Sequence, residues 1–132
     1  HSRDLLQDPH EDGHLVTLVR SDEPGLEIKI GDRFEAIDLE PDEMLVMPGS
    51  LLSLMTGNIV PPLFHQVRNS RRRTARYSQM FFVNPELNQK LDPWILNASN
   101  ADIDIIAHAN AAPQQFGLPT LVEGAKGEGN SY

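Results

Sequence analysis

The sequence predicts a mainly β domain in which antiparallel strands form a sandwich or barrel. Between residues 15 and 83, short apolar or alternating runs are separated by turn residues, which is typical of antiparallel β structure. Helical periodicity is absent from the same stretch. The chain has 132 residues, 39% of them hydrophobic, so it can build one modest core, and a single domain or part of one is expected.

The first predicted strands lie around a hairpin. LVTLV (15–19) is followed by the turn SDEPG and by LEIKI (26–30), in which alternate residues are apolar and share one face. Gly31 and Asp32 then suit a two-residue hairpin, because glycine accepts the positive φ that such a turn needs. FEAID (34–38) is the expected returning strand.

Further strands are expected at a spacing typical of a sandwich or barrel. They are MLVM (44–47), LLSLMT (51–56), FHQV (64–67) and ARYSQMFFV (75–83), with turns at Pro48-Gly49 and Gly57-Asn58. From residue 84 onward the composition changes, and ADIDIIAHA (101–109) is either a short helix or a strand. The final ten residues, EGAKGEGNSY, have the composition of a flexible tail.

Charge and composition exclude several classes of partner and site. The chain carries 11 Lys and Arg against 19 Asp and Glu, a formal net charge of -8. Nucleic acid and anionic membranes favour clustered basic residues, so neither is an expected partner. Cysteine is absent, which rules out disulfides and thiolate metal sites. Apolar runs are too short to span a bilayer and no leader pattern opens the sequence, so a soluble, cytoplasmic protein is expected.

The stretch DPHEDGHLVTLV contains three potential metal ligands just ahead of an apolar run. On a strand, residues two apart share a face, so His10 and Asp12 would present an imidazole and a carboxylate side by side. A third ligand must come from elsewhere, and His65, in a later strand-like run, is the strongest candidate. Two histidines and one carboxylate form the facial triad of non-haem Fe(II) oxygenases.

A second pair with residue spacing two follows His65 by eleven positions. Arg76 and Ser78 would place a guanidinium and a hydroxyl on one face. Arginine holds a carboxylate with two parallel hydrogen bonds, and serine adds another donor. A metal triad together with a carboxylate clamp is a far more specific combination than H-x-D alone.

In this order, H-x-D, a distant histidine and R-x-S resemble the Fe(II)/2-oxoglutarate-dependent oxygenase superfamily, in particular its isopenicillin N synthase-like branch. The resemblance covers residues 9–85, through PHEDGHLVTLV, PGLEIKIGDRFEAIDLEPDEMLVMPGSLL and FHQVRNSRRRTARYSQMFFVNP. Four single residues depart from the pattern of that branch: Phe34 replaces a tryptophan, Met47 and Ser50 replace an asparagine and an aspartate of a turn, and Gln66 replaces an arginine; the segment 62–64, Pro-Leu-Phe, also replaces a more polar approach to the distal histidine. None of these residues is a ligand, so they bear on the substrate pocket rather than on the metal.

The resemblance implies a double-stranded β-helix, or jelly roll, with residues 1–83 as the catalytic core and 84–132 as a C-terminal extension and tail. The roles that it implies are Fe(II) binding by His10, Asp12 and His65, and binding of the distal carboxylate of 2-oxoglutarate by Arg76 and Ser78. It also implies that these 132 residues are the C-terminal part of a longer enzyme.

The implied activity is oxidation of a small organic substrate by O2 and 2-oxoglutarate, by hydroxylation, desaturation or cyclisation, with release of succinate and CO2. Two alternatives stay open. One is a 2-oxoglutarate-independent Fe(II) oxidase of the isopenicillin N synthase type, in which the R-x-S pair holds the substrate's own carboxylate. The other is a non-catalytic, cupin-like metal-binding module. The pattern indicates neither a primary substrate nor an oligomeric state.

The other notable side chains are expected to be structural. His14 is expected to be a surface or satisfied histidine, with support of the metal site as the alternative. Glu11 points away from its neighbours and is expected to be solvated. The expected core residues are Met44, Met47, Met55, Phe81 and Phe82; Arg68, Arg71, Arg72 and Arg73 are expected in an exposed turn; Trp94 is expected to anchor the C-terminal segment; His1 and His108 are expected to be uninvolved.

Overall fold

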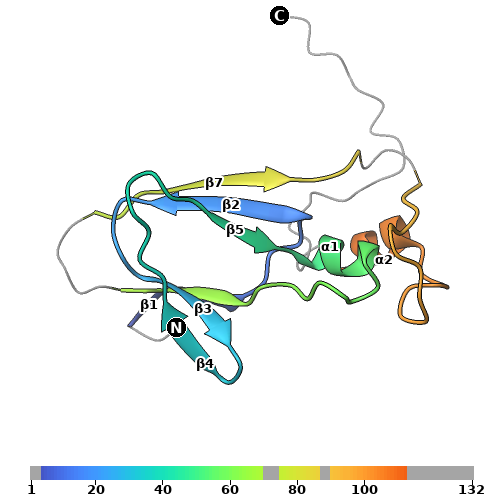
Figure 1. The fold of residues 1–132 in the computed structure, drawn as a ribbon, viewed down its shortest axis with the longest axis horizontal. Helices are drawn as coiled ribbons and strands as arrows, with labels where there is room; N and C mark the ends of the chain where they lie inside the picture. The colour runs from blue at the N-terminus through green and yellow to red at the C-terminus, as the bar shows by residue number, and fades with distance from the viewer. Residues whose placement is uncertain (1–3, 70–74, 87–89, 113–132) are drawn as a thin grey trace, which may run out of the picture.

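The structure, a computed structural model, describes residues 4–69, 75–86 and 90–112. His1, the basic residues 71–73 and the C-terminal tail lie outside these ranges. The described residues form two antiparallel sheets that lie one above the other, with two short helices at one end (Figure 1).

The first sheet has four strands in the order β1-β6-β3-β4. Their bounds are Leu5–His10 for β1, His65–Arg68 for β6, Leu26–Ile30 for β3 and Arg33–Ala36 for β4. The hairpin between β3 and β4 is the expected one, and Gly31 has a φ of 60° there. Strand β1 was not among the predicted strands, although the prediction for His10 and Asp12 assumed an extended backbone at 10–12; β1 ends at His10.

The second sheet has three strands in the order β5-β2-β7. Their bounds are Leu45–Pro48 for β5, Val16–Ser21 for β2 and Ser78–Val83 for β7. All six predicted strands other than 51–56 are therefore present in antiparallel pairs, with ends that differ by up to three residues. The mainly β prediction is confirmed.

The segment predicted as a strand at 51–56 is instead the helix α1 (Ser50–Met55). Gly57 and Asn58 both have positive φ, of 57° and 63°. Asn58 N donates to Ser53 O at 2.8 Å and Gly57 N donates to Leu54 O at 3.2 Å, which is the Schellman pattern that ends helices. The Gly57-Asn58 turn was thus expected correctly, but it ends a helix instead of a strand.

The second helix, α2 (Ile105–Ala111), resolves the alternative left open for 101–109. Asp104 is its N-cap, and its Oδ1 accepts a hydrogen bond from Ala107 N at 3.0 Å. A side chain that satisfies one of the free N–H groups at a helix start favours a helix over a strand at this position.

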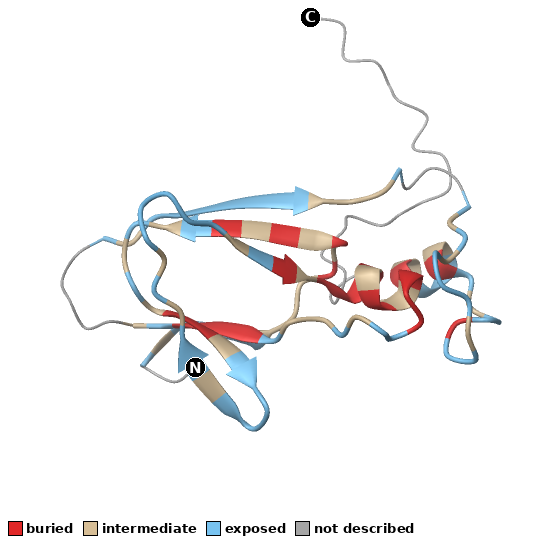
Figure 2. Cartoon of the chain, viewed as in Figure 1, coloured by how far each residue is buried: buried red, intermediate tan, exposed pale blue. Residues whose placement is uncertain are grey.

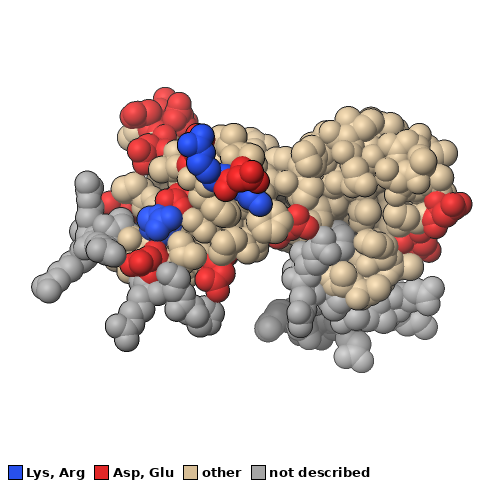
Figure 3. All heavy atoms as spheres, turned by 90° about the horizontal axis from the view of Figure 1, so that it is seen from below, with Lys and Arg blue, Asp and Glu red and all other residues tan. Residues whose placement is uncertain are grey.

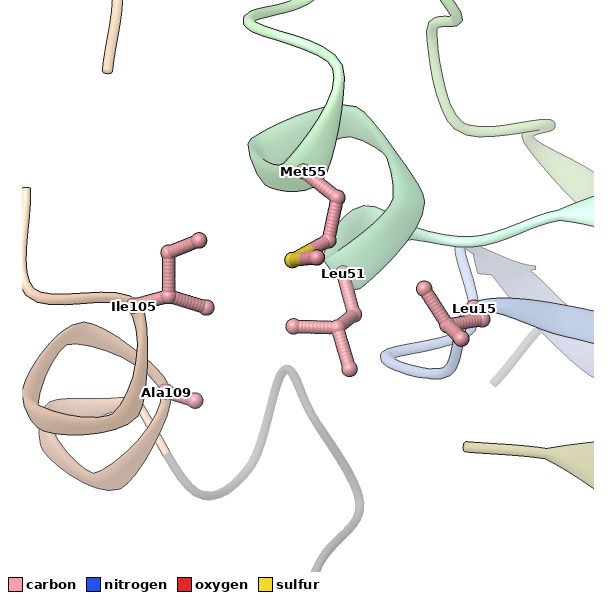
Figure 4. Packing of buried hydrophobic residues seen from close by; sticks show 5 residues of the cluster. All are labelled: Leu15, Leu51, Met55, Ile105 and Ala109. Atoms are coloured by element: carbon pink, nitrogen blue, oxygen red, sulfur yellow. The ribbon is translucent and has the colours of Figure 1, made fainter. Parts of the chain in front are cut away.

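Two apolar clusters form the core. Between the sheets, Val19 and Met47 of the second sheet pack with Leu26 and Val67 of the first (Figure 2). At the helical end, α1 and α2 pack together and against the start of β2 (Figure 4). The buried members of that cluster are Leu15, Leu51, Met55, Ile105 and Ala109.

The predicted core is partly wrong. Met47 and Met55 are each 2% exposed, as expected, but Met44, Phe81 and Phe82 are exposed. Phe81 pairs with Leu18 on β2, next to the fully buried Thr17 and the buried Val19 of the same strand. Because side chains alternate along a strand, Phe81 faces away from the core.

The segment before α2 is anchored to α1 mainly by hydrogen bonds. Asn100, which is buried, donates from Nδ2 to Leu54 O and Ile95 O, both at 2.9 Å. Trp94 donates from its backbone N to Met55 O at 2.8 Å, while its side chain is 63% exposed. Trp94 therefore anchors this segment through its backbone and not through its indole ring.

The surface of the described residues shows no extended basic area on the face in Figure 3, where Lys and Arg side chains lie beside Asp and Glu. Arg68, expected in an exposed turn, is instead the last residue of β6 and pairs with the buried Glu27, with 2.6 Å between Nε and Oε1.

Neither helix in the described part of the chain is long and apolar enough to cross a membrane.

Candidate metal centre

His10 and His65 are neighbours across two paired strands. His10 is the last residue of β1 and lies in register with His65, the first residue of β6. Their ring centroids are 4.2 Å apart, with the ring planes inclined by 55°. The antiparallel pairing anticipated for the distant histidine is therefore present, and the sheet itself fixes the spacing of the two imidazoles.

Asp12 completes the cluster from a loop. Its Oδ1 lies 3.7 Å from His10 Nε2 and 3.9 Å from His65 Nε2. One candidate ligand atom from each of the three residues lies within 4.8 Å of the others. The sequence analysis placed His10 and Asp12 on one face of a strand, which is wrong, because β1 ends at His10.

Hydrogen bonds at Nδ1 fix the tautomer that each histidine has in its neutral form. His10 Nδ1 donates to Asp8 O at 2.8 Å, and His65 Nδ1 donates to Leu63 O at 3.2 Å. A carbonyl oxygen only accepts, so each Nδ1 carries the proton and each neutral ring keeps a lone pair on Nε2. Gln7 Nε2, 3.0 Å from His10 Nε2, donates to that lone pair.

The carboxylate of Asp12 is also oriented. Thr17 Oγ1 donates to Asp12 Oδ2 at 2.6 Å, which leaves Oδ1 turned toward the histidines. Thr17 is fully buried and was missed by the sequence analysis. The sequence does contain a feature that points to Thr17: it is the one polar residue in the apolar run LVTLV. A hydroxyl buried in such a run needs a hydrogen-bond partner.

The three residues fit a divalent cation. The two Nε2 atoms and Asp12 Oδ1 converge at distances too long for hydrogen bonds to one another, which suits a cation between them. Such a cation would replace the hydrogen bond from Gln7 at His10 Nε2. Ligands at about 2.1 Å and at right angles around one ion lie about 3.0 Å apart. The two distances from Asp12 Oδ1 to the histidine Nε2 atoms, 3.7 and 3.9 Å, exceed this by less than 1 Å. Burial lowers the pKa of His65, which favours the neutral form that binds metal.

Ser78 is the first residue of β7, in the sheet opposite His65, and Arg76 lies two residues before this strand. Arg76 Nη1 donates to Ser78 Oγ at 2.5 Å, while Arg76 Nε donates to Glu23 O at 3.1 Å and to Pro24 O at 3.2 Å. Both side chains line a cavity of about 60 Å³ that His65 also lines. A strand adjoining that of His65 was expected, which is wrong: β7 belongs to the facing sheet.

A profile of the 2OG-Fe(II) oxygenase superfamily matches residues 1–85. The chain belongs to this superfamily. It is 33% identical over 114 residues to isopenicillin N synthase of Penicillium rubens, covering 86% of this chain and 34% of that protein. It is 27% identical over 88 residues to gibberellin 2-beta-dioxygenase 5 of Oryza sativa subsp. japonica, covering 64% of this chain and 26% of that protein.

The fold agrees with this membership of the oxygenase superfamily. The dioxygenase for auxin oxidation 1 of Arabidopsis thaliana, in its binary complex with 2-oxoglutarate, superposes with a TM-score of 0.64 at 22% identity. The match covers 74% of this chain and 39% of that one. The two sheets are thus those of a jelly roll, as expected. The chain spans about a third of the length of the isopenicillin N synthase that it matches.

Of two further residues near the centre, His14 agrees with its prediction and Glu11 does not. His14 is a satisfied histidine, as expected: its Nδ1 lies within 3.2 Å of the Asn84 side-chain amide, and its ring stacks on Phe82 at 4.2 Å. Glu11, expected to be solvated, is half-buried, and its Oε1 accepts a hydrogen bond from Ser50 Oγ at 2.7 Å. The expectation failed because α1 starts beside this loop.

Proposed function

We propose that this chain carries the catalytic centre of a non-haem Fe(II)/2-oxoglutarate-dependent dioxygenase that oxidises a small organic substrate. The observation that supports this most directly is the convergence of His10, Asp12 and His65 within 4.8 Å in a member of the 2OG-Fe(II) oxygenase superfamily. All residues invoked for catalysis lie in the proposed catalytic core, residues 1–83.

In this proposal, His10 Nε2, Asp12 Oδ1 and His65 Nε2 hold Fe(II) on one side and leave the other side for small molecules. Bound there, Fe(II) supplies the redox chemistry that couples O2 to oxidation of the substrate and to conversion of 2-oxoglutarate into succinate and CO2. The chain contributes the orientation: backbone carbonyls fix both imidazole tautomers, and Thr17 fixes the carboxylate.

Arg76 and Ser78 are the proposed binding residues for the distal carboxylate of 2-oxoglutarate. The backbone oxygens of Glu23 and Pro24 hold Arg76 Nε, so the planar guanidinium is oriented before a ligand arrives. Arg76 is half-buried, and this partial loss of water around its charge lowers its pKa. Hydrogen bonds to a carboxylate would replace the interactions with water that the guanidinium has lost.

The alternative is an Fe(II) oxidase that uses no 2-oxoglutarate. It is favoured by the 33% identity to a protein named isopenicillin N synthase. In that case Arg76 and Ser78 would hold a carboxylate of the substrate itself. The same donors serve either carboxylate, so the clamp alone does not distinguish the two functions.

Anaerobic titration tests the proposal. The protein is loaded with Fe(II), then titrated with 2-oxoglutarate while the visible spectrum is recorded for the weak metal-to-ligand band, and O2 is finally admitted to measure succinate. A saturable band and succinate formation are expected. Fe(II) binding without either signal would favour the 2-oxoglutarate-independent oxidase, and an absence of Fe(II) binding would refute both.

A further inference from the structure

Asp12 is held by a loop, in contrast to the two histidines. β1 ends at His10 and β2 begins at Val16, so the ladder hydrogen bonds of the sheets do not fix Asp12. A carboxylate that must meet two imidazoles within a few ångströms depends on the groups that support it. What holds this loop therefore decides where Asp12 Oδ1 points.

The start of α1 holds the loop through backbone bonds. Ser50 N donates to Asp12 O at 2.8 Å, and Gly49 N donates to Leu15 O at 3.0 Å. Ser50 is 4% exposed, so water competes little for its N–H and hydroxyl groups. These two bonds tie the loop to the start of the helix.

The side chain of Ser50 makes a second contact, to the residue between the two proposed ligands. Ser50 Oγ donates to Glu11 Oε1 at 2.7 Å. One residue of α1 thus contacts positions 11 and 12 at once, through its hydroxyl and its N–H. Rotation of the segment between His10 and Asp12 would break at least one of these bonds.

We propose that Ser50 and Glu11 are positioning residues of the metal centre, an inference that rests on the proposed function. Neither is proposed to touch the ion. Their hydrogen bond keeps the loop in the conformation in which Asp12 Oδ1 faces the two imidazoles, while Thr17 holds Oδ2. Loss of the bond lowers metal affinity even though all three ligands remain.

The test compares Ser50→Ala with Ser53→Ala. Both serines are buried in α1, and Ser53 Oγ also donates to a side-chain oxygen, that of Asn58 at 2.8 Å. The hydroxyl of Ser50 bonds to Glu11, in the loop that carries Asp12, whereas the hydroxyl of Ser53 bonds to Asn58, after α1. We expect Ser50→Ala to weaken Co(II) binding, measured by the visible spectrum of bound Co(II), about ten-fold, and Ser53→Ala to leave it within about two-fold. The melting temperatures of the metal-free proteins report folding.

A second pair of variants keeps the inference testable if Ser50→Ala does not fold. Glu11→Gln retains a side-chain oxygen that accepts from Ser50 Oγ, whereas Glu11→Ala does not. The expected result is near-parental Co(II) affinity for Glu11→Gln and about a ten-fold loss for Glu11→Ala. Equal affinities within either pair of variants would overturn the positioning role. A parent protein that binds no Co(II) would refute the metal site itself, and this inference with it.

Discussion

His10 and His65 face each other in register across β1 and β6, with ring centroids 4.2 Å apart, although they are fifty-five positions apart in the sequence. Strand pairing sets this distance, so two of the three proposed ligands belong to the rigid part of the fold. The third, Asp12, is held by Thr17 and by the start of α1. The centre therefore combines a fixed pair with one adjustable ligand.

Fe(II) should stabilise the folded protein through Asp12. At a free concentration of one hundred times the dissociation constant, a ligand of the native state adds about 2.7 kcal/mol to the free energy of unfolding. We expect Fe(II) to raise the free energy of unfolding of the parent protein by this amount, measured by urea unfolding without O2. The Asp12→Asn variant, which removes the charge but keeps the shape of the side chain, should lose the increase. Asp32→Asn, at an exposed hairpin position, is the control and should keep the full increase. Equal stabilisation of both variants would contradict the assignment of Asp12.

Replacement of Arg76 should weaken 2-oxoglutarate binding specifically. Truncation of one partner of a desolvated ion pair costs on the order of 2 to 5 kcal/mol, so Arg76→Ala should raise the dissociation constant accordingly while Fe(II) affinity stays near the parental value. Titration of the Fe(II)-loaded protein measures both. Arg20→Ala, on the exposed part of β2, serves as the matched control. An unchanged affinity for 2-oxoglutarate would support the oxidase in which the clamp holds substrate.

Gly49 should tolerate no side chain. A Cβ at this position would lie 2.1 Å from His14 O and 2.8 Å from Asp12 O, and backbone atoms cannot yield as a flexible side chain would. We expect Gly49→Ala to lower the free energy of unfolding by about 1 to 3 kcal/mol or more and to weaken metal binding, because the loop must shift. Gly31→Ala has open space around the new methyl but a φ of 60°, so it should cost stability without changing metal affinity. Parental metal binding by Gly49→Ala would show that the loop can move without displacing Asp12.

Acid should unfold the protein partly through Glu27. The hydrogen bond from Arg68, followed by that from Gln66, lowers the pKa of Glu27 despite its burial. A lowered pKa in the folded state means that this stabilisation is present above the ordinary glutamate value of 4.5 and is lost as the pH falls below it, through the folded-state value.

Urea unfolding measured from about pH 6 down to about pH 3 tests this linkage. The parent protein should lose more stability over that range than Glu27→Gln, which cannot ionise. Glu35→Gln, at an exposed position of β4, controls for the loss of one surface carboxylate and should behave like the parent. Parallel curves for all three proteins would show that Glu27 contributes nothing to acid sensitivity.

Much of the fold and the ligand set could be predicted from the sequence because the signals are local or follow a fixed order. Alternation identifies β3, and Gly31 marks its hairpin, since both depend on neighbouring residues alone. The order H-x-D, distant histidine and R-x-S indicated which side chains to look for. The assignment of α1 failed because apolar residues at 51, 52, 54 and 55 suit either a buried strand or a helix, and a six-residue helix shows too few turns for periodicity to decide.

By itself, the sequence determined six of the strands, the hairpin and the identity of the candidate ligands, because these depend on spacing along the chain. Only the tertiary structure decided that His10 and His65 lie side by side, that Arg76 and Ser78 share a cavity with His65, and that Glu11 is held by α1. It likewise decided that Phe81 lies outside the core. The physical reason is that strand partners and sheet faces are chosen by contacts between residues far apart in the chain, and no local pattern contains them.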